Sequence, residues 1–202
     1  MTKRLDFYFD FISPFGWLSS LRVDELAKRY DHDTRWQSML LGVSVLKVMG
    51  MKPLRQYPLK GDYLKHDLQR YLRKHNIKTA RDLDSAPANP LAAGRIFHIL
   101  DASDRELAKT AARALLQAYW GEARDIGDAD LAVEIASEAG ADRALLKDAL
   151  ASGEGDQLLR AAVDRSLKRG VFGSPFFIVK DEPFFGLEKM ELLEEWLAKD
   201  GW

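Results

Sequence analysis

The stretch Phe7-Tyr8-Phe9-Asp10-Phe11-Ile12-Ser13-Pro14-Phe15-Gly16-Trp17 decides how this chain of 202 residues folds. From Leu5 to Phe11 every second residue is leucine or phenylalanine, which is the period-two pattern of a strand. Ser13 then offers a side-chain oxygen as a helix N-cap, and Pro14 suits the first helical position, where a missing N–H costs nothing. The sequence predicts a strand that runs directly into a helix. Taken alone, Ser13 is read as a helix cap.

A second stretch, Gly170-Val171-Phe172-Gly173-Ser174-Pro175-Phe176-Phe177, leads into two short C-terminal strands, at 176–179 and 183–185. Pro183 suits an edge strand, because proline cannot donate to a sheet ladder. The predicted order is β-α-β, a long helical insertion, then β-β-α, with a parallel pair around the first helix. The remaining elements are a strand at 34–40, helices at 14–30, 41–49, 60–75, 91–150 and 156–169, and a closing helix after Gly186. On the 60–75 helix we expect a buried side formed by Tyr63, Leu64, Leu68, Tyr71 and Leu72.

Composition narrows the classes of function. The formal net charge of −1 argues against a general nucleic-acid or membrane binder, and no apolar run approaches the length of a membrane span. The N-terminus lacks the apolar segment of a signal peptide, so we expect a cytosolic protein. The chain has no cysteine, which excludes disulfide oxidoreductase chemistry and thiolate metal sites. Any reactive thiol must therefore come with a cofactor.

Charge is uneven along the chain. Between Lys47 and Arg81 there are ten Lys or Arg residues against two acids. This excess indicates either a solvated helix face or a lobe that attracts an anionic small molecule, and the sequence leaves both open. The four histidines show no metal-ligand spacing, so we predict no metal site. They are His32, His66, His75 and His98.

The order of elements, with a proline just before the third strand, resembles a thioredoxin-like fold of the DsbA type with a helical domain inserted in its middle. More closely, the chain resembles kappa-class glutathione transferases and 2-hydroxychromene-2-carboxylate isomerases. The segments that carry this resemblance are the two stretches quoted above, Lys60-Gly61-Asp62-Tyr63-Leu64 and Tyr119-Trp120-Gly121-Glu122. The resemblance implies a thioredoxin-like domain at residues 1–42 and 168–202 and an inserted helical domain at 43–167. It also implies a homodimer.

The resemblance implies glutathione as the cofactor. Ser13 stands where the family has a catalytic serine that hydrogen-bonds the glutathione sulfur. Pro175 matches a cis-proline, and the exposed main chain of Ser174 would pair with glutathione as a strand pairs at a sheet edge. Lys60 matches a lysine that reaches a glutathione carboxylate. The residues that match the contacts to the γ-glutamyl end are Leu187 and Glu188.

Two departures from the family pattern concern the affinity for glutathione. Members commonly carry an asparagine in the loop before the Lys60 helix, whereas this chain has Met51 in the sequence Gly50-Met51-Lys52-Pro53-Leu54. Glu188 replaces an aspartate, which places the carboxylate one methylene further from the backbone, and Leu187 replaces a polar neighbour.

The resemblance implies a glutathione-dependent isomerase in which Ser13 stabilises a thiolate that adds reversibly to an unsaturated, aromatic-derived small molecule. A helix N-terminus and a hydroxyl donor both lower the pKa of a bound thiol. Phe15, Trp17 and Phe185 are candidates for an aromatic substrate wall, with core packing as an equal alternative, and Arg55 is a candidate for the substrate carboxylate. Two alternatives remain: a kappa-class-like transferase that conjugates glutathione to electrophiles, and a non-catalytic module that binds thiols or peptides.

Overall fold

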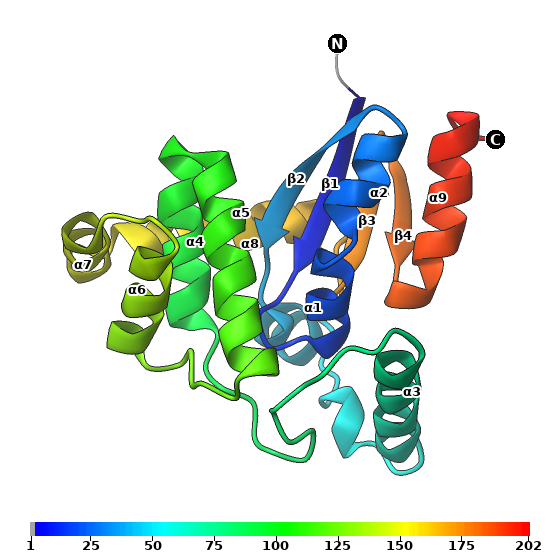
Figure 1. Cartoon of the computed structure of the whole chain (residues 1–202), viewed down its shortest axis with the longest axis horizontal. Helices are drawn as coiled ribbons and strands as arrows, with labels where there is room; N and C mark the ends of the chain where they lie inside the picture. Colours follow the sequence, from blue (N-terminus) through cyan, green and yellow to red (C-terminus); the bar gives the residue numbers. More distant parts are fainter. Residues whose placement is uncertain (1–2) are drawn as a thin grey trace.

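The computed structural model describes residues 3–202 and has a four-stranded mixed sheet at its centre (Figure 1). The strands are β1 (Lys3–Phe9), β2 (His32–Ser38), β3 (Phe176–Val179) and β4 (Glu182–Phe185), in the order β2-β1-β3-β4. β1 pairs in parallel with β2, as the order of elements predicts, and its antiparallel pairing with β3 is a finding of the structure. Pro183 lies on the edge strand β4, which confirms that expectation.

Helices connect and cover the sheet. In Figure 1, α4 to α7 lie together on the left of the sheet, α9 lies beside β4, and α3 stands apart at the lower right. No helix within residues 3–202 is long and apolar enough to cross a bilayer. The α-helices are α1 (Pro14–Ser20), α2 (Val23–Arg29), α3 (Lys60–Lys74), α4 (Leu91–Ser103), α5 (Arg105–Leu116), α6 (Ala129–Glu138), α7 (Arg143–Ala151), α8 (Glu154–Lys168) and α9 (Met190–Lys199). The other helical turns are the π-helices η1 (Gly42–Val48) and η3 (Gln117–Gly121) and the 3-10 helices η2 (Leu54–Gln56) and η4 (Leu187–Lys189).

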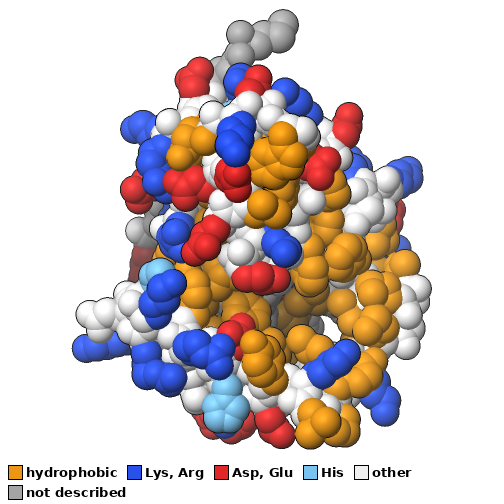
Figure 2. Space-filling model, turned by 90° about the vertical axis from the view of Figure 1, so that its right-hand side faces the viewer, with side chains coloured by type: hydrophobic (Ala, Val, Ile, Leu, Met, Phe, Trp, Pro, Cys, Tyr) orange, Lys and Arg blue, Asp and Glu red, His pale blue; other side chains and the backbone are white. Residues whose placement is uncertain are grey.

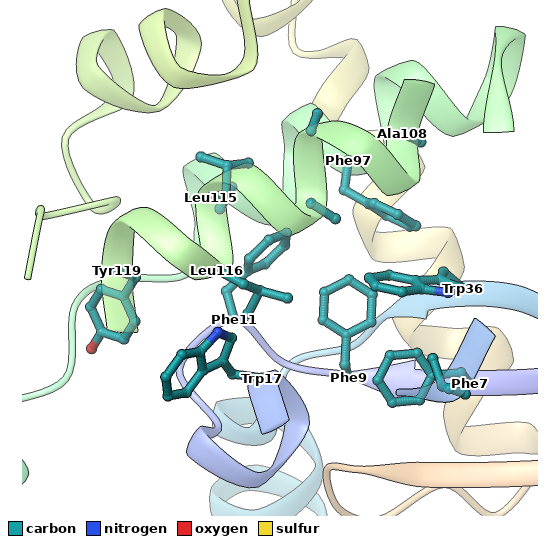
Figure 3. Close-up of a cluster of buried hydrophobic side chains, with 14 of the residues drawn as sticks. Phe7, Phe9, Phe11, Trp17, Trp36, Phe97, Ala108, Leu115, Leu116 and Tyr119 are labelled. Carbon is teal, nitrogen blue, oxygen red and sulfur yellow. The ribbon is translucent and has the colours of Figure 1, made fainter. Parts of the chain in front are cut away.

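A large core joins the sheet to the helices of the inserted region (Figure 3), and a smaller buried cluster includes Tyr8 and Phe176. Phe7 stacks on Phe177 of β3 with ring centroids 5.4 Å apart, and Phe9 meets Phe97 of α4 edge-to-face at 5.5 Å. Because helices of the inserted region pack on the sheet through this core, the two parts are not separated by an exposed linker of the kind that marks domain boundaries. The boundaries at 42/43 and 167/168 stay a prediction.

The first helix is shorter than its apolar pattern predicts. The sequence indicates one helix over 14–30, but α1 ends at Ser20 and α2 begins at Val23. The Ser20 hydroxyl donates to the Trp17 carbonyl at 2.6 Å, a serine back-bond of the kind that bends helices. Arg22 has left the helical region, with φ −129°. The seven-residue α1 therefore carries only a short run of aligned peptide dipoles.

α3 packs loosely on the rest of the molecule. Leu68 and Leu72 are buried as expected, but the expectation for Tyr63 is wrong, because that side chain is 61% exposed. The reason is that the first turns of α3 extend away from the sheet, and only its second half contributes side chains to the core (Figure 1).

Candidate functional site

The two stretches that the sequence singles out meet where β1 ends. The Ser13 hydroxyl donates to the Ser174 carbonyl oxygen at 2.9 Å. The Ser13 Oγ also accepts from the Gly16 N–H at 3.0 Å, so Ser13 is the N-cap of α1 as predicted. The Ser174–Pro175 peptide bond is cis. Ser13 thus joins the first turn of α1 to the loop that precedes β3.

Gly16 allows the two segments to come this close. A Cβ atom at position 16 would lie 2.6 Å from the Ser174 Oγ and 3.2 Å from the Ser13 Cβ. A side chain here would displace the Ser174 Oγ, because real Cβ atoms essentially never approach neighbours that closely. Sequence analysis did not assign a role to Gly16, since a glycine in the first turn of a helix has no distinctive local pattern.

Among residues 3–202, the N–H groups of Phe15 and Ser174 at this junction have no hydrogen-bond acceptor. The Phe15 N–H is one of the N-terminal helix donors that have no acceptor within the helix, and Pro14 before it has no N–H at all. The Ser174 N–H lies in the bend before β3. Together with the Ser13 hydroxyl they can bind an electron-rich atom at α1 and a main chain alongside Ser174.

A buried carboxyl group, Asp10, lies directly behind this junction. Its side chain is fully buried, and burial raises its pKa to about 6 against an ordinary value of 3.8. Its oxygens accept from the Ile12 N–H at 3.1 Å and the Leu41 N–H at 2.7 Å, and these two bonds hold the pKa below what burial alone would give. In the sequence, Asp10 stands out only as a polar residue in the strand alternation. A lone acid between two phenylalanines was the one available signal.

The predicted glutathione contacts beyond Ser13 and Ser174 lie on two segments. Leu187 and Glu188 are on η4, which packs against α1. Leu187 is buried in the core, so only its backbone could face a ligand, whereas Glu188 is exposed. Lys60 is exposed at the first residue of α3, with its Nζ 5.9 Å from the centre of the Tyr57 ring.

The candidates for an aromatic wall divide into core and surface residues. Trp17 is 2% exposed and its ring stacks on Trp120 at 6.1 Å and 14°, so packing and not a substrate wall is its role (Figure 3). Phe15 is partly buried against the core. Phe185 is 44% exposed and packs on Phe172 with ring centroids 4.6 Å apart.

Arg55, the candidate for a substrate carboxylate, has its guanidinium bonded elsewhere. It donates to the Ser85 carbonyl oxygen at 2.8 Å. The side chain is exposed, and this single neutral bond is the contact that holds it toward the loop at 82–86. An anionic ligand would have to compete with that carbonyl, which is feasible because charge-assisted bonds are about twice as strong as neutral ones.

The face that carries α3 and α9 is hollowed, and hydrophobic side chains surround the hollow (Figure 2). The segment from η1 to the first turn of α3 contributes an unusual number of exposed apolar side chains, which suits a surface that receives a flat apolar ligand or a partner. These exposed residues are Leu46, Val48, Met49, Met51, Leu54, Leu59 and Tyr63.

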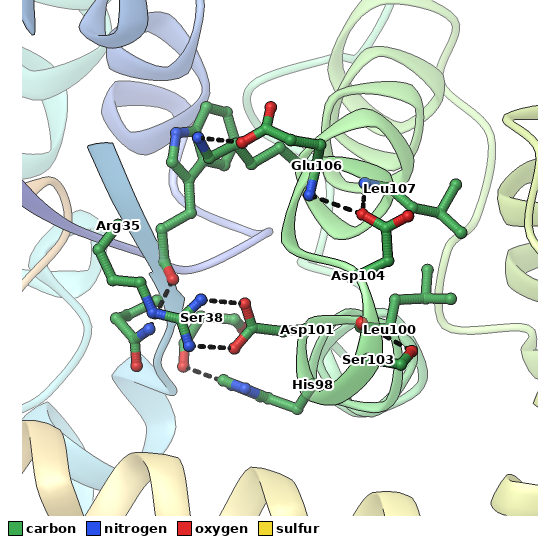
Figure 4. A network of polar contacts seen from close by, with 12 residues as sticks. Arg35, Ser38, His98, Leu100, Asp101, Ser103, Asp104, Glu106 and Leu107 are labelled. Atoms are coloured by element: carbon green, nitrogen blue, oxygen red, sulfur yellow. Dashed lines mark hydrogen bonds and ion pairs between the residues drawn. The ribbon is translucent and has the colours of Figure 1, made fainter. Parts of the chain in front are cut away.

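A second polar cluster lies between β2 and α4 (Figure 4). Arg35 of β2 forms a two-fold ion pair with Asp101 of α4, and His98 of α4 donates from Nε2 to the Ser38 carbonyl oxygen at 3.0 Å. Burial lowers the pKa of His98 to about 4, so the ring is neutral. Two cavities of about 280 and 370 Å³ adjoin this cluster and share Arg35 and Arg105.

The family model described as a DSBA-like thioredoxin domain matches residues 4–198, nearly the whole chain. The chain belongs to this family. The DSBA-like domain is 28% identical over 198 residues to a 2-hydroxychromene-2-carboxylate isomerase of Sphingobium xenophagum, covering 98% of this chain and 99% of the relative. It is 24% identical to glutathione S-transferase kappa 1 of Caenorhabditis elegans, covering 97% of this chain and 91% of that protein. A solved 2-hydroxychromene-2-carboxylate isomerase superposes with a TM-score of 0.81 at 26% identity, covering 97% and 95% of the two chains.

Proposed function

We propose that this protein is a glutathione-dependent isomerase of the 2-hydroxychromene-2-carboxylate type. The observation that carries the proposal is the contact between the Ser13 hydroxyl and the Ser174 main chain, at a helix end with a free N–H beside it. Isomerases of this name are similar to the chain over nearly its full length. The absence of cysteine requires that a reactive sulfur come from a bound molecule.

The residues present suit bound glutathione. The Ser13 hydroxyl and the Phe15 N–H are donors for a sulfur anion, and the Ser174 N–H is a donor for a peptide carbonyl. The exposed Glu188 suits an ammonium group, and the exposed Lys60 suits a carboxylate. When bound, glutathione would supply a nucleophilic thiolate that is recovered unchanged after the isomerisation.

Ser13 would act by transferring its hydrogen bond. In the free protein its proton is directed to the Ser174 carbonyl oxygen, and rotation about the Cβ–Oγ bond redirects it toward a sulfur atom at the helix end while the oxygen still accepts from the Gly16 N–H. A hydrogen bond to a charged group contributes about 1.5–3 kcal/mol. Since α1 has only seven residues, its dipole adds about 0.3 kcal/mol, the low end of the usual range. The hydroxyl is therefore the main factor that lowers the pKa of the thiol. Serine also cannot form a disulfide with it.

The substrate side of the site combines apolar surface with positive charge. We propose that Phe15 and Phe185 contact a flat, aromatic-derived substrate and that Arg55 leaves the Ser85 carbonyl to bind the substrate carboxylate. Met51, in place of the family's asparagine, adds apolar surface to the same side and removes one amide contact to glutathione.

A transferase that conjugates glutathione to electrophiles is the second candidate, and the similarity to a kappa-class transferase favours it. Both reactions need the same activated sulfur, so they differ only in whether the sulfur is released from the product.

The deciding experiment follows 2-hydroxychromene-2-carboxylate spectroscopically with and without glutathione, and measures total free thiol at the end. An isomerase converts many equivalents of substrate while free glutathione stays constant, whereas a transferase consumes one glutathione per product. Ser13→Ala should lower the rate about 100-fold or more, as removal of one anion-stabilising donor does. If glutathione fails to bind at millimolar concentration in calorimetry, both enzyme proposals are wrong and a module for other ligands remains.

A further inference from the structure

Asp10 is a buried carboxyl group without a cation. Its exposure is 0%, and no Lys, Arg or His side chain of the described residues contributes to its pKa. Buried carboxylates are normally paired with a cation, since an isolated buried charge is costly. Such an arrangement next to a candidate ligand site is more readily explained by function than by stability.

All four polar groups of Asp10 are used, and they reach three separate segments. Its carboxylate accepts from Ile12 in the loop before α1 and from Leu41 just before η1. Its own N–H donates to the Ser174 Oγ at 2.9 Å, and its carbonyl accepts from the Ser13 N–H at 3.0 Å. Asp10 therefore ties the Ser13 turn, the loop before Pro175 and the start of η1 together.

We propose that Asp10 is a positioning residue whose ionised carboxylate holds the Ser13 turn and the Ser174 loop in the geometry that binds glutathione. This inference rests on the proposed function. Only in the ionised carboxylate are both oxygens hydrogen-bond acceptors with no proton of their own. Once a proton occupies one oxygen, that oxygen becomes a donor facing another donor, and the bond to either Ile12 or Leu41 weakens.

The surroundings of Asp10 allow its carboxylate to be protonated near neutral pH. Burial raises its pKa to about 6, and the bonds from Leu41 and Ile12 oppose that shift. The titratable side chain on a neighbouring element that Asp10 influences is Tyr119 of η3. Burial raises the pKa of that phenol above its ordinary value, so Tyr119 is uncharged throughout the range in which Asp10 titrates.

The first test uses the unmodified protein without glutathione. Carboxyl ¹³C NMR should show Asp10 titrating near pH 6, and the amide signals of Ser13, Ser174 and Leu41 should shift with the same midpoint. If Asp10 titrates while the Ser13 and Ser174 amides stay fixed, the carboxylate does not position the site and the proposal is overturned. This result does not depend on glutathione, so it decides the proposal even if the isomerase function is wrong.

The second test compares glutathione affinity in two matched variants by calorimetry from pH 5 to pH 8. Asp10→Asn should bind roughly tenfold more weakly at pH 8, because a buried N–H loses its acceptor, and should lack the inflection near pH 6 that the parent shows. The control is Asp142→Asn, since Asp142 also accepts from two backbone N–H groups but lies exposed at α7. It should keep the parent affinity and inflection. Parent-like affinity and pH dependence in Asp10→Asn would overturn the proposal.

Discussion

Two carboxyl groups with contrasting surroundings, Asp10 and Asp101, distinguish the candidate site from the framework. Asp101 meets the guanidinium of Arg35 in a two-fold ion pair, which joins α4 to β2. Asp10 also joins separate segments, but through backbone N–H groups alone. In an ion pair, each charge compensates the other, so the pair can join two elements. A buried carboxyl group without a cation instead has a raised pKa, so it can gain or lose a proton near neutral pH. This contrast supports the proposal that the region behind Ser13 serves ligand binding, whereas the ion pair beside β2 joins two elements of the fold.

The largest effect is expected from breaking the paired region. Arg35→Ala leaves the Asp101 carboxylate, whose side chain is 11% exposed, without its cation. We expect a loss of about 4 kcal/mol in the free energy of unfolding, measured by urea denaturation. Glutathione affinity of the folded protein should not change. The control is Arg160→Ala, because Arg160 is exposed on α8 and should cost little. A loss no larger than that of the control would show that the pair does not support the fold.

His98 sharpens the contrast because it is buried in its neutral form. Burial lowers its pKa to about 4. As the pH falls from 7, His98 is therefore protonated in the unfolded chain before it is protonated in the folded protein. The folded state should therefore lose about 3 kcal/mol between pH 7 and pH 4 through this residue. His98→Gln keeps an N–H for the Ser38 carbonyl and should remove that loss. Equal acid sensitivity in the parent and the variant would contradict the assignment.

Asp10 should act on stability in the opposite direction. Because burial raises its pKa to about 6, the folded protein binds a proton before the unfolded chain does. Relative to Asp10→Asn, the parent should gain about 2 kcal/mol of unfolding free energy as the pH falls from 7 to 4. Parallel denaturation curves for the two proteins across this range test the sign. A relative loss in the parent would mean that the carboxylate is favoured by the fold.

Gly16→Ala tests how closely the two halves of the site must approach. The new methyl group would displace the Ser174 Oγ, which accepts from the Asp10 N–H. We expect glutathione to bind roughly tenfold more weakly, the loss of about one such bond. The matched control is Gly42→Ala, which adds a methyl group into open space. If both variants bind like the parent in calorimetry, the close approach is not required for binding.

The sequence is sufficient for the parts of the fold that depend on local pattern. The strand that leads into the Ser13 cap, the parallel β1–β2 pair and the edge position of Pro183 are all present. These features follow from periodicity, capping and proline chemistry, which a sequence displays directly.

The remaining features depend on packing that no local pattern displays. The burial of Asp10 is set by η1 and the loop before β3, which are distant in sequence. The break after Ser20 comes from a hydroxyl bond and not from a glycine or proline. Tyr63 fits an apolar stripe but lies on a part of α3 that extends from the body. The homodimer, the cytosolic location and the domain boundaries stay predictions.

The central claim is that the Ser13 hydroxyl holds a thiolate, and a pH titration of the ultraviolet absorbance of bound glutathione thiolate tests it most directly. The parent should show a midpoint roughly one to two pH units below that of Ser13→Ala, as a charge-assisted hydrogen bond requires. Asp104→Ala removes the N-cap of α5 and controls for loss of a cap alone, so its midpoint should equal the parent's. The same midpoint in Ser13→Ala as in the parent would contradict the account.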